Sequence, residues 1–241
     1  MSPVVFGVSA WAWCTTPSAV QVAGGIGKDA GAPLLDLPPA ERRRLNPLTS
    51  LALRAAETLV AGRERAQLQA TPLVFGSADG DGAVLMKLLG ALRAHEPLSP
   101  TQFHNSVHNT PAGYWTIALG SQATSTAIAA DEETLEVALA EAGLQAVVRG
   151  GPVLMLYASR AFPPELAHVR PGLADFAIAA WCESASAAGS WRCELRSTVK
   201  PAASDSTPLA TAILTQGETG LCGLRRVAHL GGVLTIERVV A

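Results

Sequence analysis

Three acidic residues, Asp131, Glu132 and Glu133, lie where a predicted strand passes into a predicted helix. The strand covers residues 124–130 and the helix covers residues 131–143. A helix N-terminus presents unpaired N–H groups and the positive end of the helix dipole, so it favours an anion. A cysteine at such a turn becomes a reactive thiolate, whereas an aspartate caps the helix, stays ionised and is a poor acyl acceptor. The residue types therefore predict a helix cap at a place where covalent chemistry would need a thiol.

Two histidines, His104 and His108, are four residues apart and would share one face of a helix as a possible metal-binding pair. Asn105 stands where a zinc motif would have glutamate, and no third ligand follows nearby. Hydrogen bonds from these histidines to Asn105 or Asn109 are the favoured interpretation. No metal site is predicted.

The segment 79–82, Asp-Gly-Asp-Gly, begins like a calcium-binding loop, but Gly90 stands where such a loop needs its closing glutamate. A glycine-rich turn between a strand and a helix is the better interpretation. The sequence contains neither a GxSxG nucleophile elbow nor a GxxxxGK[ST] phosphate loop, which argues against a hydrolase and an NTPase. Cys222 has glycine neighbours but no adjacent base, so a packed thiol is more plausible than a nucleophile. No cofactor is predicted.

Composition favours one compact domain over residues 1–241, since 49% of the residues are hydrophobic and 16% are charged. So few charges also suggest that part of the surface is covered by another subunit, because obligate interfaces resemble a domain core. The net charge of -2 gives no support for binding nucleic acid or an anionic membrane surface. No apolar run reaches the roughly 20 residues of a membrane span. Residues 1–8 lack a signal-peptide pattern and the four cysteines are scattered, so a cytoplasmic location is expected.

Strand-like runs alternate with helical runs, and this alternation predicts an α/β layered fold. Helices are expected over residues 47–59, 83–92, 131–143 and about 207–214. Strands are expected over residues 4–8, 72–77, 124–130, 146–157, 173–181, 191–196 and 233–238. The expected strand over 146–157 is interrupted at Gly150 and Gly151.

The segment 98–113, LSPTQFHNSVHNTPAG, resembles the ketosynthase-like proteins of bacterial pigment clusters. It is close to the pattern SPTxFxxSVHNxxAG of the small chain-length-factor-like subunits that are encoded beside aryl polyene ketosynthases. The opening strand, residues 46–49, residues 74–77 and the strand–helix unit ending at Gly143 agree in the same order, so the resemblance covers about residues 1–160. It implies a thiolase-like layered fold, truncated to the N-terminal ketosynthase half plus a reduced C-terminal part, because a complete ketosynthase contains a duplicated half.

The resemblance also implies a role. It places Asp131 or Glu132 where a condensing enzyme has its nucleophilic cysteine, so no catalytic residue is expected. It implies a non-catalytic chain-length-factor-like subunit of a type II polyketide synthase, which pairs with an active ketosynthase and meets an acyl carrier protein through that complex. The residues expected to line or gate the acyl tunnel at the subunit interface are Phe103, Val107, His108, Thr110 and Pro111. Bulky apolar side chains at the end of a closed groove decide which chain lengths fit.

The alternative is a stand-alone enzyme, either one that decarboxylates malonyl thioesters on a carrier protein or another acyl-thioester enzyme without a cysteine. Decarboxylation needs an oxyanion hole but no nucleophile. In the family the reaction also uses two histidines from glycine-rich loops of the second half. Here His168 and His229 are the histidines late in the chain, and neither has that setting. Their setting favours the non-catalytic subunit.

Overall fold

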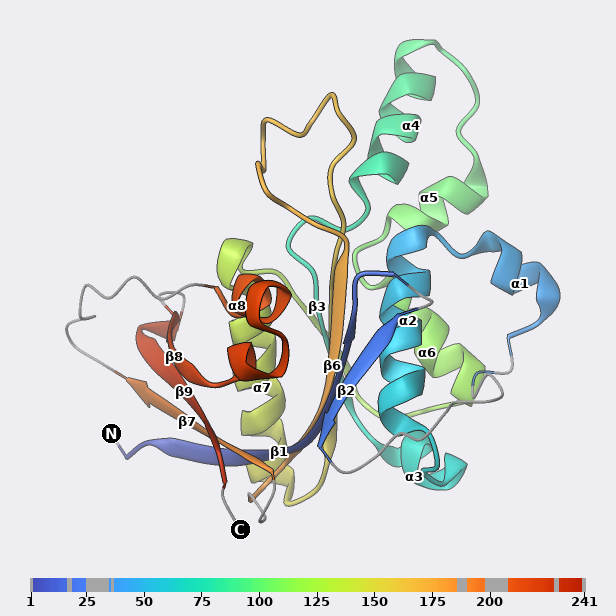
Figure 1. Cartoon of the computed structure of the whole chain (residues 1–241). Coiled ribbons are helices and arrows are strands. Elements are labelled where there is room, and N and C mark those ends of the chain that lie inside the picture. The colour runs from blue at the N-terminus through green and yellow to red at the C-terminus, as the bar shows by residue number, and fades with distance from the viewer. Residues whose placement is uncertain are drawn as a thin grey trace.

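The computed structural model describes residues 2–16, 19–24, 35, 37–185, 190–197, 208–227 and 230–239, with the backbone alone for 224–227. In this part of the chain a nine-stranded mixed sheet forms the middle layer, and helices cover both of its faces (Figure 1). The expected α/β layered class is therefore confirmed. His229, one of the two late histidines considered above, lies outside the described residues.

The elements follow one another along the chain as strands and helices of ordinary length. The strands are β1 (Val4–Cys14), β2 (Val20–Gly24), β3 (Leu73–Gly76), β4 (Ser125–Ile128), β5 (Val153–Ser159), β6 (Phe176–Glu183), β7 (Trp191–Ser197), β8 (Gly223–Val227) and β9 (Gly232–Arg238). The helices are α1 (Pro39–Arg44), α2 (Pro47–Val60), α3 (Arg65–Ala70), α4 (Gly82–Arg93), α5 (Pro100–Ser106), α6 (Thr110–Leu119), α7 (Thr134–Arg149) and α8 (Leu209–Gln216). Two short 3-10 helices are η1 (Asp131–Glu133) and η2 (Gly217–Leu221).

The strand order in the sheet is β4-β3-β5-β6-β1-β7-β9-β8, and β2 also pairs with β1. Strands β4, β3 and β5 are parallel, whereas β6 is antiparallel to both β5 and β1. The carboxyl ends of the three parallel strands point to one edge of the sheet, and the connections that follow them meet there. This geometry brings the turn after β4 close to the segments that follow β3 and β5.

The two faces of the sheet carry separate apolar cores. Helices α2 and α6 cover one face, and α7 and α8 cover the other (Figure 1). Helix α2 begins at Asn46, whose side chain accepts a hydrogen bond from Thr49 N at 2.7 Å, an ordinary N-cap. Helix α7 approaches the sheet closely because Gly143 faces the Phe6 ring, where an added Cβ would lie 2.4 Å from ring carbons. This packing holds the C-terminal half of α7 close to β1.

Several expected elements are confirmed and two are wrong in part. The helices predicted over 47–59 and 83–92 are α2 and α4, and the helix predicted near 207–214 is α8. The strand predicted over 146–157 is wrong in its first half, because α7 continues to Arg149 and the strand starts at Val153. The β-branched residues Val147 and Val148 suggested a strand, but Gly150, with φ +67, ends the helix in the left-handed conformation. The strand expected from residue 173 begins at Phe176, because residues 160–175 form a loop.

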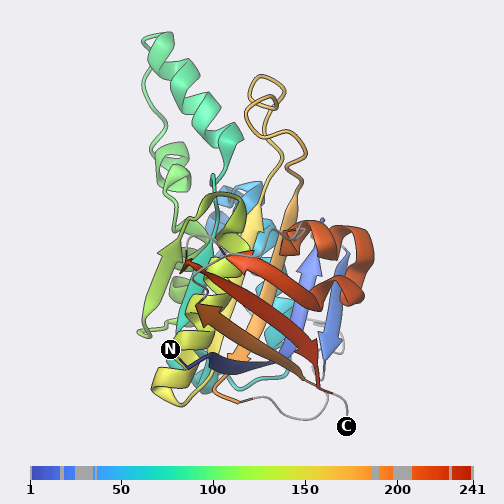
Figure 2. The ribbon, with the colours of Figure 1, turned by 90° about the vertical axis from the view of Figure 1, so that its left-hand side faces the viewer.

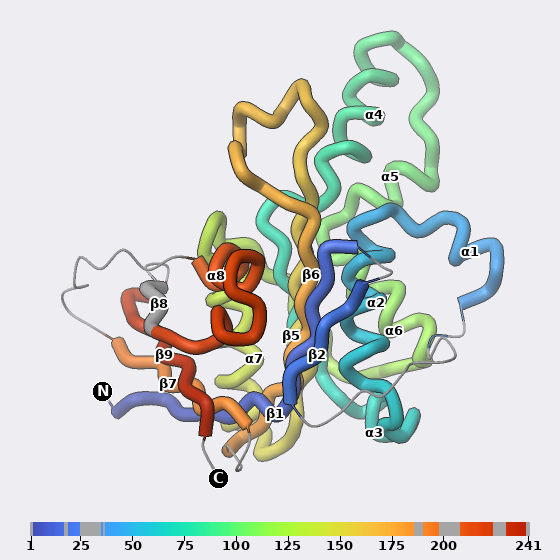
Figure 3. Tube along the Cα trace, viewed as in Figure 1, coloured from blue at the N-terminus to red at the C-terminus, as the bar shows by residue number. Residues whose placement is uncertain are grey.

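Two segments project from the same end of the molecule, namely the α4–α5 pair and the loop of residues 160–175 (Figure 3). Both follow the carboxyl ends of parallel strands, since α4 comes after β3 and the loop comes after β5. Among the residues that the structure describes, no helix is long and apolar enough to cross a membrane.

Candidate functional site

The turn after β4 is a strained strand-to-helix connection. Asp131 adopts φ +51, a left-handed conformation that costs most residues about 1–2 kcal/mol and that aspartate tolerates better than most. The Thr134 hydroxyl closes the turn, because it accepts a hydrogen bond from Ala130 N at 2.9 Å and donates one to Asp131 O at 2.6 Å. A sharp turn that presents its first residue to the surface is therefore built into the backbone.

Asp131 does not cap the helix, contrary to the expectation from sequence. It is the first residue of η1, and neither η1 nor α7 has a side-chain cap. The Asp131 carboxylate, 62% exposed, instead forms an ion pair with the guanidinium of Arg170. The left-handed backbone directs this side chain toward the 160–175 loop. Asp131 and Glu132, the two candidates for the missing cysteine, both line the cavity described below.

Arg170 binds a second carboxylate at this turn. Its Nε lies 2.9 Å from Oδ2 of Asp79, which follows β3. Burial opposes the charge of Arg170, but the hydrogen bonds with Asp131 and Asp79 outweigh it and raise the pKa of the guanidinium. A single cation therefore joins the segment after β3, the turn after β4 and the loop after β5.

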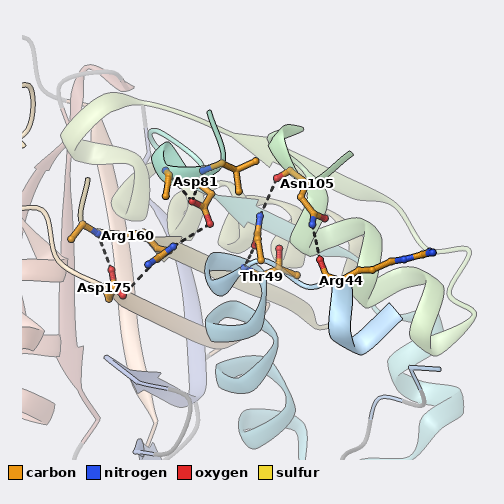
Figure 4. Close-up of polar contacts among 10 residues, drawn as sticks. Arg44, Thr49, Asp81, Asn105, Arg160 and Asp175 are labelled. Atoms are coloured by element: carbon orange, nitrogen blue, oxygen red, sulfur yellow. Dashed lines mark hydrogen bonds and ion pairs between the residues drawn. The ribbon is translucent and has the colours of Figure 1, made fainter. Parts of the chain in front are cut away.

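A second arginine secures the base of the projecting α4. Arg160 Nη1 lies 3.4 Å from Asp81 Oδ2, and its Nε lies 3.6 Å from Asp175 Oδ2 (Figure 4). Asp81 also caps α4 by accepting hydrogen bonds from the backbone N–H groups of residues 83 and 84. Asp79 and Asp81, which suggested a calcium loop, are therefore bound by arginines and by a helix N-terminus. Within the described ranges, no three His, Cys, Asp or Glu side chains lie together as metal ligands.

A cavity of about 290 Å³ opens beside the turn. Asp79, Asp131, Glu132 and Arg170 form its charged part, and Tyr157 lies among its lining residues. Burial raises the pKa of Tyr157, so this phenol stays neutral at physiological pH. The lining of the cavity thus includes carboxylates and an arginine, and no thiol is among the described lining residues.

None of the described cysteines lines the cavity at this turn. Burial raises the pKa of Cys14 to about 11 and raises that of Cys182 and Cys193 as well. All three lie on strands inside the protein. Cys222, half-buried, follows η2. A raised pKa keeps a thiol protonated and therefore weakly nucleophilic.

The residues predicted to line an acyl tunnel divide into two groups. Val107 and Thr110 line an apolar cavity of about 640 Å³ together with Gly113, Tyr114 and Ile117. The other three predicted residues are not among its lining residues. Phe103 is exposed on α5, Pro111 is buried in α6, and His108 points inward.

The two histidines of this segment do not form the predicted contacts. Helix α5 ends at Ser106, so His104 and His108 are not on one helix face. His108 Nε2 lies 2.6 Å from Ser77 O, and the His104 ring packs edge-on against Tyr114. Hydrogen bonds to Asn105 or Asn109 were expected, but Asn105 instead donates to Arg44 O at 2.6 Å (Figure 4). The asparagine thus joins α5 to the end of α1, and His108 joins the segment to β3.

Sequence reasoning did not identify Arg160, Arg170, Asp175 or Tyr157. The three charged residues lie in or beside a loop that lacks hydrophobic periodicity, and Tyr157 reads as a core residue of β5. These residues lie close to the segment after β3 because the strand order places β5 next to β3. The signal that could have found them is topological: polar residues that follow parallel strands gather at one sheet edge.

Comparison with known proteins agrees with this architecture. Residues 12–231 match the family described as beta-ketoacyl synthase, N-terminal domain. A search of curated proteins finds no match. Among solved structures, the chain is similar to a chain of the ketosynthase ApeO in complex with its chain length factor ApeC from Xenorhabdus doucetiae, with a TM-score of 0.68, 20% identity and coverage of 97% of this chain and 99% of the other.

Two further structures are similar over less of their length. The ishigamide ketosynthase/chain length factor gives a TM-score of 0.55 at 18% identity, covering 89% of this chain and 71% of the other. A beta-ketoacyl synthase from Burkholderia phymatum gives a TM-score of 0.55 at 14% identity, covering 76% of this chain and 59% of the other. At these identities the likeness concerns the fold, and it confirms the predicted thiolase-like class.

Proposed function

This chain belongs to the family described as beta-ketoacyl synthase, N-terminal domain, and we propose that it is a non-catalytic, chain-length-factor-like subunit that pairs with an active ketosynthase. The observation that carries the proposal is the turn after β4. A carboxylate held by Arg170 stands at the start of the helix where a condensing enzyme needs a thiolate. The similar solved structures include ketosynthases with chain length factors, which supports the same assignment.

An exposed sheet edge supports the pairing. Strand β4 ends the sheet and pairs with β3 on one side, so in the described part of the chain its outer backbone groups face no strand. Such an edge is a template for a strand of another chain. Charged residues make up only 16% of the chain, and this low fraction is consistent with a subunit whose surface is partly covered in a complex.

The 640 Å³ cavity supports a share in the acyl tunnel. Its lining is mainly apolar and includes Val107, Thr110 and Ile117 from the segment that the resemblance assigns to the tunnel. In this proposal Val107 and Thr110 line the acyl tunnel directly. His108 and Pro111 do not line it and instead hold the lining segment in position. Phe103, exposed on α5, is available to a partner. The finer role that we propose is type II synthesis of an aryl-polyene-like product, with the acyl carrier protein bound through the complex.

Co-expression with a ketosynthase of the same genome tests the pairing. We expect a stable one-to-one complex in gel filtration with mass determination, and we expect the chain expressed by itself to aggregate because its apolar surface lacks a cover. A stable monomer with no affinity for the ketosynthase contradicts the proposal. That result would direct attention to assays of thioester decarboxylation by the chain itself.

The tunnel role is tested within the complex. Val107→Trp should fill part of the cavity and shift the products toward shorter chains, as measured by mass spectrometry. Val148→Trp is the matched control, because Val148 is 84% exposed near the end of α7 and is not among the residues lining this cavity. Equal product lengths in the two variants would contradict the tunnel role without affecting the pairing.

A further inference from the structure

Helix α4 has an apolar face that the described residues cover only in part. The helix contains two charged residues, Lys87 and Arg93, among twelve. Leu85, Leu89 and Leu92 are 46%, 48% and 55% exposed, and their spacing places them on one face of the helix. A helix that is hydrophobic on most of its circumference is normally buried.

A neighbouring face of α4 is already used inside this chain. Val84 and Leu88 are buried, and α4 packs against α5. The leucine face (Leu85, Leu89 and Leu92) is therefore additional to the contacts that fold the helix. About half of each of these three leucine side chains stays exposed, which a binding role would explain.

The base of the helix holds this face in a fixed direction. Asp81 caps α4 and pairs with Arg160, as described above. Gly82 lies directly against the Phe162 ring, so close that an added Cβ would be 2.7 Å from a ring carbon. The leucine face is consequently presented by a helix that is anchored to the 160–175 loop, which lowers the entropy cost of docking.

The position of α4 indicates the partner. Helix α4 follows β3, the strand next to the edge strand β4. Figure 2 shows α4 and β4 toward the same side of the molecule, with α4 projecting beyond the body. A stable interface buries about 800 Å² on each partner, and a four-residue edge strand is too small to supply this area. The pairing surface must therefore extend past β4, and the leucine face is apolar surface on that side.

We infer that the leucine face docks on the same ketosynthase subunit that pairs with β4, so that α4 forms a second contact with this partner. This inference rests on the proposed function. Docking on an anionic membrane is disfavoured, because α4 offers two basic residues and the chain has a net charge of -2. A second copy of this chain is another outcome that the experiment below distinguishes.

The test compares two leucine substitutions in the co-expressed complex. Leu89→Glu places a charge in the leucine face, whereas Leu214→Glu makes the same change at a leucine of α8 that is 41% exposed. Helix α8 lies on the other side of the molecule (Figure 1). We expect Leu89→Glu to weaken binding of the tagged ketosynthase at least ten-fold, measured by dilution and native mass spectrometry, and Leu214→Glu to leave it unchanged. The milder Leu92→Gln, with circular dichroism of each purified complex, separates lost docking from lost folding.

The outcomes are distinguishable. If the wild-type chain binds the ketosynthase and Leu89→Glu binds it equally tightly, the inference is overturned and the proposed function stays intact. Absence of any wild-type complex refutes the proposed function itself. A wild-type homodimer that Leu89→Glu dissociates, with ketosynthase binding unchanged, shows that the face serves a second copy and also overturns the inference. Retention of wild-type chain on anionic vesicles, lost in Leu89→Glu, would assign the face to a membrane instead.

Discussion

The guanidinium of Arg170 lies 2.9 Å from the carboxylate of Asp79 and also pairs with Asp131. The three residues are far apart in sequence and come from the segments after β5, β3 and β4. The carboxylate at the turn thus has a structural partner, whereas a catalytic thiolate would have to remain accessible to an acyl group. This relationship explains how the turn keeps its strained shape without a nucleophile.

Removing Arg170 should destabilise the fold moderately. Arg170→Met leaves the partly buried Asp79 without its cation, and we expect a loss of about 1–2 kcal/mol in the free energy of unfolding by urea. Arg44→Met is the control, because its pair with Glu41 is exposed and should contribute less than about 1 kcal/mol. Equal losses in the two variants would show that the Arg170 contacts do not stabilise the loop.

Replacements of Asp131 should separate backbone strain from charge. Asp131→Asn loses the ion pair but tolerates φ +51, whereas Asp131→Ala also takes on the cost of the left-handed conformation. Alanine should therefore be less stable than asparagine by about 1 kcal/mol in urea unfolding. If the two variants have the same stability, the turn does not retain its left-handed residue.

A cysteine at position 131 should be reactive but should not condense acyl chains. In Asp131→Cys, Arg170 and the helix N-terminus would lower the thiol pKa, so alkylation by iodoacetamide should be faster than for the other thiols. Among the described residues, no histidine lines the cavity at the turn, so none is there to stabilise the enolate that decarboxylation forms. A condensed product from this variant, paired with a ketosynthase whose own cysteine is removed, would contradict the assignment.

Thiol labelling should report the burial of the native cysteines. At pH 8 the folded protein should expose at most one reactive thiol, Cys222, because burial raises the pKa of the other three, that of Cys14 to about 11. All four cysteines should react after unfolding. Cys222→Ser should abolish the reaction of the folded protein with a chromogenic disulfide. Rapid reaction of two or more native thiols would be inconsistent with the packing of β1, β6 and β7.

The stability of the protein should depend on pH through Glu57. Burial raises the pKa of this carboxyl, although the hydrogen bond from Leu35 N at 3.1 Å and nearby arginines oppose the shift. The folded state therefore holds the proton more tightly than the unfolded state. The stability contributed by the protonated carboxyl is present at low pH and is lost as pH rises through the raised folded pKa. Glu57→Gln should therefore gain stability relative to the native protein at pH 7, but not at pH 4. A gain of equal size at both values would exclude titration of Glu57 as its cause.

Local patterns explain what sequence analysis predicted correctly. Helix α2 was predicted because its apolar residues recur at helical spacing after Asn46 and Pro47. The end of α7 was misjudged because Val147 and Val148 favour strands locally, while packing of the preceding turns on the sheet extends the helix. The prediction that Asp131 caps the helix was also wrong. The sequence around Asp131 reveals neither its φ angle nor that Arg170 lies opposite its carboxylate.

The sequence by itself determined the α/β class, the absence of cysteine at the turn and the segment 98–113 that carries the family resemblance. These properties depend on residue type and near-neighbour spacing. The tertiary structure alone decided that Arg170 binds Asp79 and Asp131, that Val107 and Thr110 share a cavity, and that His108 points inward. It also decided that the leucine face of α4 stays about half exposed in the described part of the chain. Such relationships depend on strand order and long-range packing, which bring residues separated by many positions within contact distance and leave no periodic trace along the chain.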